Sequence, residues 1–383
     1  MKRRGWILAA ALVIGLLPLR VNAAALASAG KSAVLMDVTT GTVLYEANAH
    51  EPLAPASVTK VMTMLLIMEA LDSGRVQYTD LVTASEAAAA KGGSQIYLKV
   101  GETMTARDML KSIAVSSAND CACAMAEHLA GSEGAFVEQM NRRAGELGMN
   151  DTHFVNCTGL DDGEDAAQHR TSAYDIALMS RELLVKHPDI KKFTSIWMDT
   201  VRNGAFGLSN TNKLIRFYNG ATGLKTGYTS GAGYCLSATA EREGLELIAV
   251  VMGCETSQKR AAACKSMLDY GFANFSLVSP GLEEDLRVPV TLGAADSVPL
   301  TLAGGDSMLI DKGQKNLISY EVASEPSVKA PVAKGQALGS LTVKAGDQVL
   351  KTIPLIAASN VDRLTWGNLF LTVLRRAAMG KTP

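Results

Sequence analysis

The sequence predicts an α+β fold, in which one antiparallel sheet carries helices on its faces and a small all-β domain follows. Three observations predict it. Apolar runs separated by glycine turns occur near the start of the chain and again at about residues 223–253. Helical patterns fill the sequence between these two groups of strands. After Phe275 the pattern changes to short alternating runs.

The elements of the first part follow in order. The run SAVLMDVTTGTVLYEAN, from Ser32, predicts a hairpin, because a Thr-Gly turn separates two apolar segments. Residues 58–71 predict a helix with almost no polar face, which should therefore be buried. The run from Gly223 to Gly253 predicts three antiparallel strands. The remaining predicted helices are two within 102–130 and one each at 134–148, 172–186 and about 257–271.

These patterns divide the chain into a first domain at 24–275, an all-β domain at 276–357 and a tail at 358–383. On a helical wheel the tail has a wide apolar face that includes Trp366 and Phe370, with Arg375 and Arg376 beside it. A tryptophan, a wide apolar face and flanking cations predict a helix lying in a membrane interface. The alternatives are a helix docked on the β domain and an oligomer contact.

The first 23 residues predict a cleaved secretory signal. Lys2, Arg3 and Arg4 precede the apolar run WILAAALVIGLLPL, and small residues follow it up to Ala23. The apolar run is shorter than the ~20 residues that a membrane span needs. The mature chain is therefore expected outside the cytoplasm. A formal net charge of −1, without any basic stretch interleaved with aromatics, argues against nucleic-acid binding.

The six cysteines are interpreted as buried thiols. They lie in apolar or small-residue surroundings, with no CxxC pair and no His/Cys cluster of zinc type. The sequence leaves one disulfide open as an alternative. Because the chain also has no HExxH, GxSxG or EF-hand motif, we expect neither a metal nor an organic cofactor.

The stretch PASVTK places Ser57 three residues before Lys60 where a helix should begin. The simplest interpretation is a helix start, with Ser57 as N-cap and Lys60 solvated. At this spacing, however, both side chains lie on one face of the first turn. A lysine can activate a serine if burial and a second cation lower its pKa, and Lys225 is the candidate for that cation.

Two further motifs make the second interpretation stronger. Ser117-Ala118-Asn119 falls in a turn between two helices, and Lys225-Thr226-Gly227 falls on a predicted strand. SxxK, SxN and KTG in this order are typical of penicillin-binding proteins and class A β-lactamases. Each motif alone is weak evidence, but all three together make chance a minor explanation.

The chain resembles the low-molecular-mass penicillin-binding proteins that are serine-type D-alanyl-D-alanine carboxypeptidases. The resemblance covers nearly all of the mature chain. It rests on PASVTKVMTMLL, the SSAND turn, NDTHFVNCTGL, HRTSAYDIALMSREL, GLKTGYTSGAGYCLSATA, LDYGF, the β domain ending KGQALGSLTVKAGDQVLKTIPLIA, and the tail. It implies a β-lactamase/transpeptidase-like sheet in the first domain. Cys157 departs from the proline usual in the NxTGL stretch, which puts only the local loop geometry in doubt.

The resemblance implies a role for each motif residue. Ser57 would attack the D-Ala–D-Ala peptide bond and form an acyl-enzyme, with Lys60 as general base. Ser117 would relay the proton to the leaving amine. Asn119 would bind the substrate backbone and steady Lys60.

The remaining implied roles concern substrate binding. Lys225 and Thr226 would hold the terminal carboxylate, and Gly227 would let the substrate lie close to its strand. The backbone N–H groups of Ser57 and Tyr228 would form the oxyanion hole. Arg260 would lie near the carboxylate end of the site, with a solvated charge at a helix start as the alternative.

The prediction is therefore an exported D,D-carboxypeptidase, tethered at the outer face of the cytoplasmic membrane or in the cell wall. It would trim peptidoglycan stem peptides and be acylated by β-lactams. The alternatives are a D,D-endopeptidase or transpeptidase, a class A β-lactamase and an idle stem-peptide binder. ELGMN at residues 146–150 imitates a β-lactamase motif, but Leu147 continues an apolar stripe and Gly148 suits a helix end.

Overall fold

The computed structural model describes residues 26, 29–163, 165–282, 285–304, 307–367 and 370. The predicted signal, residues 1–23, and the tail from residue 371 onward lie outside the described residues. In the described part, no helix is long and apolar enough to cross a membrane.

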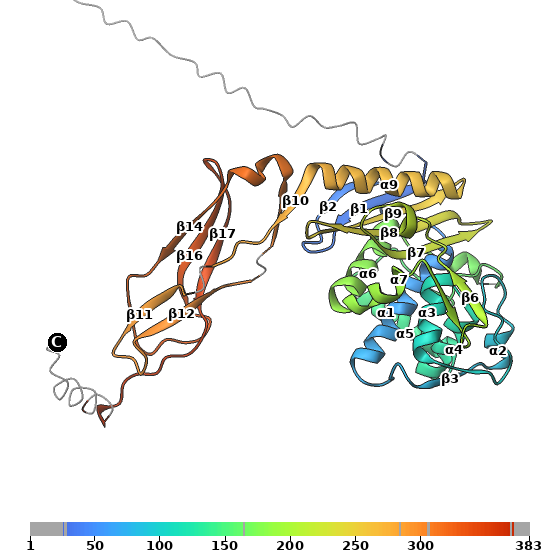
Figure 1. Ribbon diagram of the computed structural model, residues 1–383, viewed down its shortest axis with the longest axis horizontal. Coiled ribbons are helices and arrows are strands. Elements are labelled where there is room, and N and C mark those ends of the chain that lie inside the picture. The colour runs from blue at the N-terminus through green and yellow to red at the C-terminus, as the bar shows by residue number, and fades with distance from the viewer. Residues whose placement is uncertain are drawn as a thin grey trace, which may run out of the picture.

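A five-stranded antiparallel sheet organises the first domain, with the strand order β2-β1-β9-β8-β7. The two ends of this domain's sequence therefore meet in its centre, where β1 pairs with β9. Figure 1 shows the sheet between one long helix and a larger helical layer. The strands are β1 (Ser32–Asp37), β2 (Val43–Ala47), β7 (Ala221–Thr229), β8 (Gly233–Arg242) and β9 (Leu245–Cys254).

One face of the sheet is covered by helix α9, Ser257–Asn274, and the other by the helical layer (Figure 1). At the centre of the layer lies α1, which is buried on nearly all sides, as its apolar sequence predicts. The main helices of this layer are α1 (Lys60–Asp72), α3 (Ala106–Ser116), α4 (Asn119–Ala130), α5 (Glu133–Glu146) and α6 (Ala173–Lys186).

Short elements connect the main helices and strands. Most relevant to the site is the 3₁₀ turn η2, Ala56–Thr59, which leads directly into α1. The other short elements are β3 (Leu81–Thr83), α2 (Glu86–Ala89), β4 (Thr103–Thr105), η3 (Ala166–Gln168), η4 (Pro188–Ile190), α7 (Lys191–Thr194), β5 (Met198–Val201), β6 (Phe206–Ser209) and α8 (Leu214–Phe217).

The second domain is all-β and has its own hydrophobic core. Its six-stranded sheet has the order β14-β16-β17-β12-β11-β15. The strands are β11 (Arg287–Thr291), β12 (Ser297–Leu302), β14 (Ile318–Ser324), β15 (Val328–Lys329), β16 (Ala337–Ala345) and β17 (Gln348–Ala357). The α+β fold class with a following all-β domain is thus confirmed.

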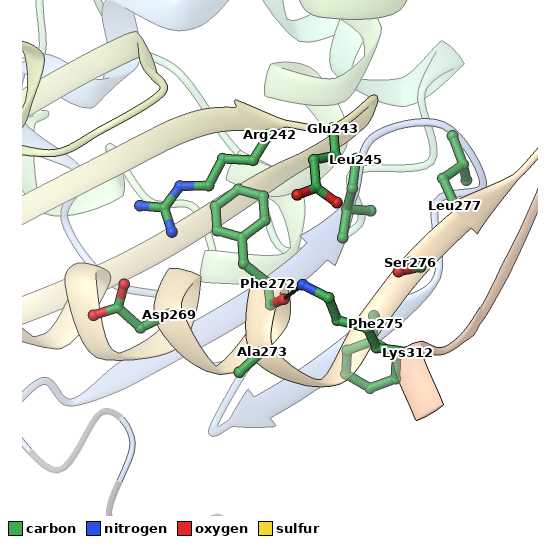
Figure 2. A pocket seen from close by; sticks show the side chains of 10 residues that line it. All are labelled: Arg242, Glu243, Leu245, Asp269, Phe272, Ala273, Phe275, Ser276, Leu277 and Lys312. Carbon is green, nitrogen blue, oxygen red and sulfur yellow. Dashed lines mark hydrogen bonds between the residues drawn. The ribbon is translucent and has the colours of Figure 1, made fainter. Parts of the chain in front are cut away.

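The chain passes between the domains through β10 (Phe275–Val278), which pairs with β13 (Met308–Asp311); the 3₁₀ helix η5 (Lys312–Leu317) follows. At this junction lies a cavity of about 330 Å³, shown in Figure 2. Arg242 stacks on Phe272 there, 4.5 Å from the ring centroid, and Lys312 Nζ donates to the Phe272 carbonyl at 2.9 Å.

The burial of α1 makes its apolar side chains the main support of the first domain. We expect Ile67→Ala, at a fully buried position, to lower the free energy of unfolding by about 2–5 kcal/mol, since the removed atoms leave a cavity. Val185→Ala in α6, where the valine is 44 % exposed, should change it by less than about 1 kcal/mol. Urea titration followed by far-UV circular dichroism measures both; equal losses would contradict the role given to α1.

Candidate active site

Ser57 and Lys60 lie together at the junction of η2 and α1. Lys60 Nζ is 2.9 Å from Ser57 Oγ and donates to the Thr158 carbonyl at 2.8 Å. The lysine is fully buried, whereas Ser57 is half-buried. The interpretation of this stretch as an ordinary helix start is wrong, because Thr59 is the N-cap of α1 and Lys60 is not solvated.

Burial makes Lys60 a base near neutral pH. Loss of hydration destabilises the ammonium and lowers the pKa of Lys60 to about 7, although the nearby Cys157 and Asp120 oppose the shift. A neutral amine hydrogen-bonded to a serine hydroxyl is the arrangement that nucleophilic catalysis requires.

Two glycines allow other backbone segments to pack closely against η2, the turn that carries Ser57. A Cβ on Gly159 would lie 1.9 Å from the Ala56 carbonyl oxygen, and one on Gly227 would lie 2.7 Å from the Pro55 oxygen. Ala56 itself has a φ of 48°, an uncommon value for a residue with a side chain. The glycine of the KTG motif therefore lets β7 pack against the turn that carries Ser57. This packing reason differs from the substrate proximity expected from the resemblance.

Ser117 and Asn119 lie at the turn from α3 to α4. Ser117 is 3 % exposed and caps α3 with a φ of 63°. Asn119 Nδ2 donates to the Gly92 carbonyl at 2.7 Å, while its buried Oδ1 has no hydrogen-bond partner among the described residues. The unpaired oxygen is an acceptor suited to a ligand amide. The amide nitrogen is engaged by Gly92 and is not directed to Lys60.

Lys225 and Thr226 come from β7. Lys225 is 1 % exposed, and its Nζ donates to the Thr226 carbonyl at 2.8 Å. Burial first, and then the positive charges of Lys60 and Arg260, hold the pKa of Lys225 well below its usual range. Thr226 Oγ1 donates to Thr211 Oγ1 at 2.7 Å. Lys225 therefore lies near Lys60, as predicted, but the lowered pKa of Lys60 comes from burial, and the effect of one lysine on the other appears in the pKa of Lys225.

Arg260 lies on α9, and its side chain extends to strands β7 and β8 of the sheet. Its Nη1 donates to the carbonyls of Gly227 and Cys235 at 3.0 and 3.2 Å. Its guanidinium lies 5.5 Å from the centroid of the Tyr234 ring, which in turn stacks on Tyr228 at 4.2 Å. The buried Nε lacks a partner among the described residues. Arg260 is thus tied to the KTG strand, so the alternative of a solvated charge at a helix start is wrong.

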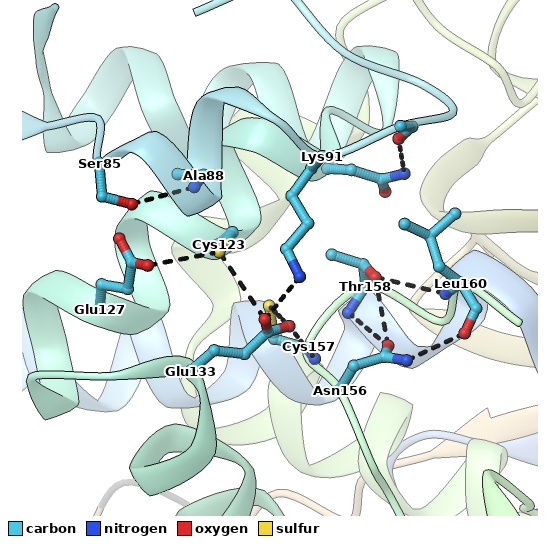
Figure 3. Close-up of polar contacts among 12 residues, drawn as sticks. Ser85, Ala88, Lys91, Cys123, Glu127, Glu133, Asn156, Cys157, Thr158 and Leu160 are labelled. Carbon is cyan, nitrogen blue, oxygen red and sulfur yellow. Dashed lines mark hydrogen bonds and ion pairs between the residues drawn. The ribbon is translucent and has the colours of Figure 1, made fainter. Parts of the chain in front are cut away.

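The loop 156–160 supplies a contact that sequence reasoning missed, the Thr158 carbonyl. Asn156 Oδ1 accepts from the backbone N–H groups of Thr158 and Gly159 at 3.1 and 2.7 Å. The Asn156 amide donates to the Leu160 carbonyl at 2.9 Å, as Figure 3 shows. Thr63 from α1 donates to the Cys157 carbonyl at 2.6 Å. This bracing fixes the carbonyl that accepts from Lys60.

His169 is a second residue that sequence reasoning missed. Its Nδ1 accepts from the Val155 N–H at 3.1 Å, so its Nε2 carries the proton and donates to Thr59 Oγ1 at 2.7 Å. Thr59 then donates to the Ala56 carbonyl at 2.9 Å. Burial, followed by nearby positive charge, lowers the pKa of His169 to about 4. The neutral His169 ring therefore links Val155, just before the loop 156–160, to Thr59 in the turn that carries Ser57.

The described residues include no group of three or more His, Cys, Asp or Glu side chains arranged to hold a metal ion. Glu146, the residue of the ELGMN stretch that imitates a deacylating glutamate, has a 54 % exposed side chain and pairs with Arg143 at 3.2 Å. It is the last residue of α5, and among the described residues the polar partner of its side chain is Arg143.

Comparisons with known proteins agree with this geometry. Residues 20–256 match the peptidase S11 family model described as D-alanyl-D-alanine carboxypeptidase, and residues 272–363 match the C-terminal domain of penicillin-binding protein 5. The chain is 44 % identical over 358 residues to the D-alanyl-D-alanine carboxypeptidase DacF of Bacillus subtilis, covering 92 % of this chain and 90 % of that protein.

Two solved structures are similar. Penicillin-binding protein 5 from Haemophilus influenzae is 30 % identical with a TM-score of 0.73, and the match covers 88 % of this chain and 98 % of that one. Penicillin-binding protein D2 from Listeria monocytogenes, in its ampicillin-bound form, is 33 % identical with a TM-score of 0.58. That match covers 64 % of this chain and 98 % of the Listeria chain.

The buried neutral His169 gives a pH dependence of stability. Its folded-state pKa of about 4 lies below the ordinary 6.5, so the unfolded chain binds the proton more tightly. Stability is complete above pH 6.5 and falls between pH 6.5 and 4, by on the order of 3 kcal/mol. Urea unfolding at several pH values should show this loss. His169→Gln should remove it, whereas His128→Gln, at an exposed position, should keep it.

Proposed function

The chain belongs to the serine-type D-alanyl-D-alanine carboxypeptidases, and we propose that Ser57 and Lys60 carry out the reaction of that family in this protein. The observation that carries the proposal is the buried Lys60 amine, with a pKa of about 7, at 2.9 Å from Ser57 Oγ. In its neutral form, Lys60 accepts the Ser57 proton as Oγ attacks the carbonyl carbon of the D-Ala–D-Ala bond.

The reaction proceeds in two steps. Attack forms a tetrahedral intermediate; its collapse breaks the C–N bond, leaves an acyl group on Ser57 and releases D-Ala as the amine takes a proton. Lys60 holds the proton taken from Ser57, and Ser117 relays it to the leaving nitrogen. Water then attacks the ester carbonyl, the shortened stem peptide leaves and Ser57 regains its proton. No metal or organic cofactor enters either step.

The oxyanion hole is formed by the backbone N–H groups of Ser57 and Tyr228. The close approach of β7 to η2, through Gly227, brings these two backbone segments together. Loss of one such donor typically slows acyl transfer by about 10²–10³-fold. A residue of the turn η2 and a residue of the strand β7, far apart in the sequence, thus stabilise one developing negative charge.

Substrate is held by its terminal carboxylate and its backbone. The carboxylate lies against Lys225 Nζ and Thr226 Oγ1, where its negative charge raises the pKa of Lys225 again and favours the ammonium. Arg260 adds positive charge behind the strand. The unpaired Asn119 Oδ1 accepts from a substrate amide. Because β-lactams carry a carboxylate next to a strained amide, they occupy the same groups and acylate Ser57.

We place the protein outside the cytoplasm, since its family acts on peptidoglycan. An N-terminal export signal and a C-terminal amphipathic helix account for this location at the outer face of the membrane. Trp366 and Phe370, in the tail, are 86 % and 66 % exposed, which suits insertion into a membrane interface. The chain then trims stem peptides close to the membrane surface.

The nucleophile is tested with a tripeptide. We expect the mature chain without residues 368–383 to release free D-Ala from diacetyl-Lys-D-Ala-D-Ala, and Ser57→Ala to reduce the release by at least about 10⁴-fold. A D-amino-acid oxidase assay measures it. Ser73→Ala, a serine at the far end of α1, is the matched control and should retain activity. If neither the unsubstituted chain nor Ser57→Ala releases D-Ala, the assignment shifts to an endopeptidase, a β-lactamase or an idle binder.

The general base is tested by pH. Because Lys60 must be neutral and its pKa is about 7, the acylation rate should reach a plateau above pH 7 and fall about tenfold per pH unit below it. Single-turnover labelling with a fluorescent penicillin separates this step from deacylation. Lys60→Arg stays protonated and should acylate at least 10²-fold more slowly at every pH. A wild-type rate independent of pH between 5 and 8 would exclude Lys60 as the base.

A further inference from the structure

Two cysteines lie close together at the loop 156–160, whose Thr158 carbonyl accepts from Lys60. They are Cys157 in this loop and Cys123 in α4. Cys123 lies near enough to Cys157 to be the first cause of the raised pKa of the Cys157 thiol, ahead of burial. Both also contact one carboxylate, with Cys157 Sγ 3.2 Å from Glu133 Oε1 and Cys123 Sγ 3.9 Å from Glu133 Oε2 (Figure 3). Both thiols are fully buried. All six cysteines are free and buried.

The positions of the two sulfurs relate them to the site. Cys123 lies one turn after Asn119 in α4, and Cys157 immediately precedes Thr158, whose carbonyl accepts from Lys60.

We propose that Cys123 and Cys157 form an intramolecular disulfide in the exported protein, which ties α4 to the loop 156–160. The oxidant is an organic or protein disulfide of the extracytoplasmic space. One thiolate attacks it and forms a mixed disulfide; the second thiolate displaces the remaining thiol. Two cysteine thiols and one disulfide are thereby converted to one cystine and two thiols, with a new S–S bond of about 2.05 Å.

The surroundings tolerate this oxidation. Glu133 loses the thiol donor but keeps Lys91 Nζ at 2.6 Å and the Cys157 N–H at 3.2 Å, so its charge remains paired. Because the Cys157 sulfur is buried next to a carboxylate, its thiolate is disfavoured in the folded protein and the bond forms as the chain folds. Once formed, it is shielded from reductants for the same reason. It anchors Cys157, the residue next to the Thr158 carbonyl that accepts from Lys60.

The test uses the full-length exported chain, purified without reductant, quenched in acid and alkylated with N-ethylmaleimide under denaturing conditions. Proteolysis and mass spectrometry should recover Cys123 and Cys157 in one linked species that a reductant separates. The linkage should persist in Cys121→Ser and Cys264→Ser, at two other buried cysteines, and disappear in Cys123→Ser. Alkylation of both cysteines, even after refolding with oxidised glutathione, would overturn the proposal, as would a linkage of Cys157 to Cys121.

A second measurement tests whether the disulfide stabilises the folded protein. Closing this loop should raise Tm by on the order of 5 °C relative to the protein refolded in reductant, and the Cys123→Ser/Cys157→Ser variant should show no such difference. An equal Tm in both states would contradict this stabilisation. Labelling with a fluorescent penicillin is followed in parallel. Its failure in both redox states would count against the proposed function and leave the disulfide result standing.

Discussion

The burial of two neighbouring lysine amines, one of them hydrogen-bonded to Ser57, is the constraint on which the rest of the first domain depends. Lys60 and Lys225 are both removed from water, and among the described residues neither is ion-paired with a carboxylate. Their hydrogen bonds go to neutral oxygens, supplied by η2, by loop 156–160 and by β7. Carboxylate partners would favour the ammonium and raise both pKa values. The fold keeps Lys60 basic by providing acceptors that carry no charge.

Neutral acceptors require backbone to approach backbone, and this explains the packing around the serine turn. Carbonyl groups reach the two amines only if strand, loop and turn come closer than side chains normally allow. Gly159 and Gly227 permit that approach, while Asn156, Thr63 and His169 fix the segments once they have met. The antiparallel sheet and the buried helix α1 bring these segments together from distant parts of the sequence.

Local patterns were sufficient to predict the fold class and the three motifs. The apolar run after Lys60 predicts a buried helix because burial on all sides leaves a clear sequence pattern, and the strands follow from alternation and glycine turns. The Thr158 carbonyl and the Thr59–His169 link have no such pattern. One is a backbone group that any residue carries, and the other joins residues 110 positions apart. The packing role of Gly227 also appears only when the opposing Pro55 carbonyl is seen.

The Thr158 carbonyl has an evolutionary consequence. A backbone oxygen is specified by no particular codon, so point mutation has no means of replacing this acceptor of Lys60 with a different chemical group. Selection can alter this acceptor only through the neighbours that position the carbonyl, Asn156, Cys157 and Gly159. The same groups also serve the physiological reaction. A substitution that slows acylation by an antibiotic therefore also slows trimming of stem peptides, and resistance by this route carries a fitness cost.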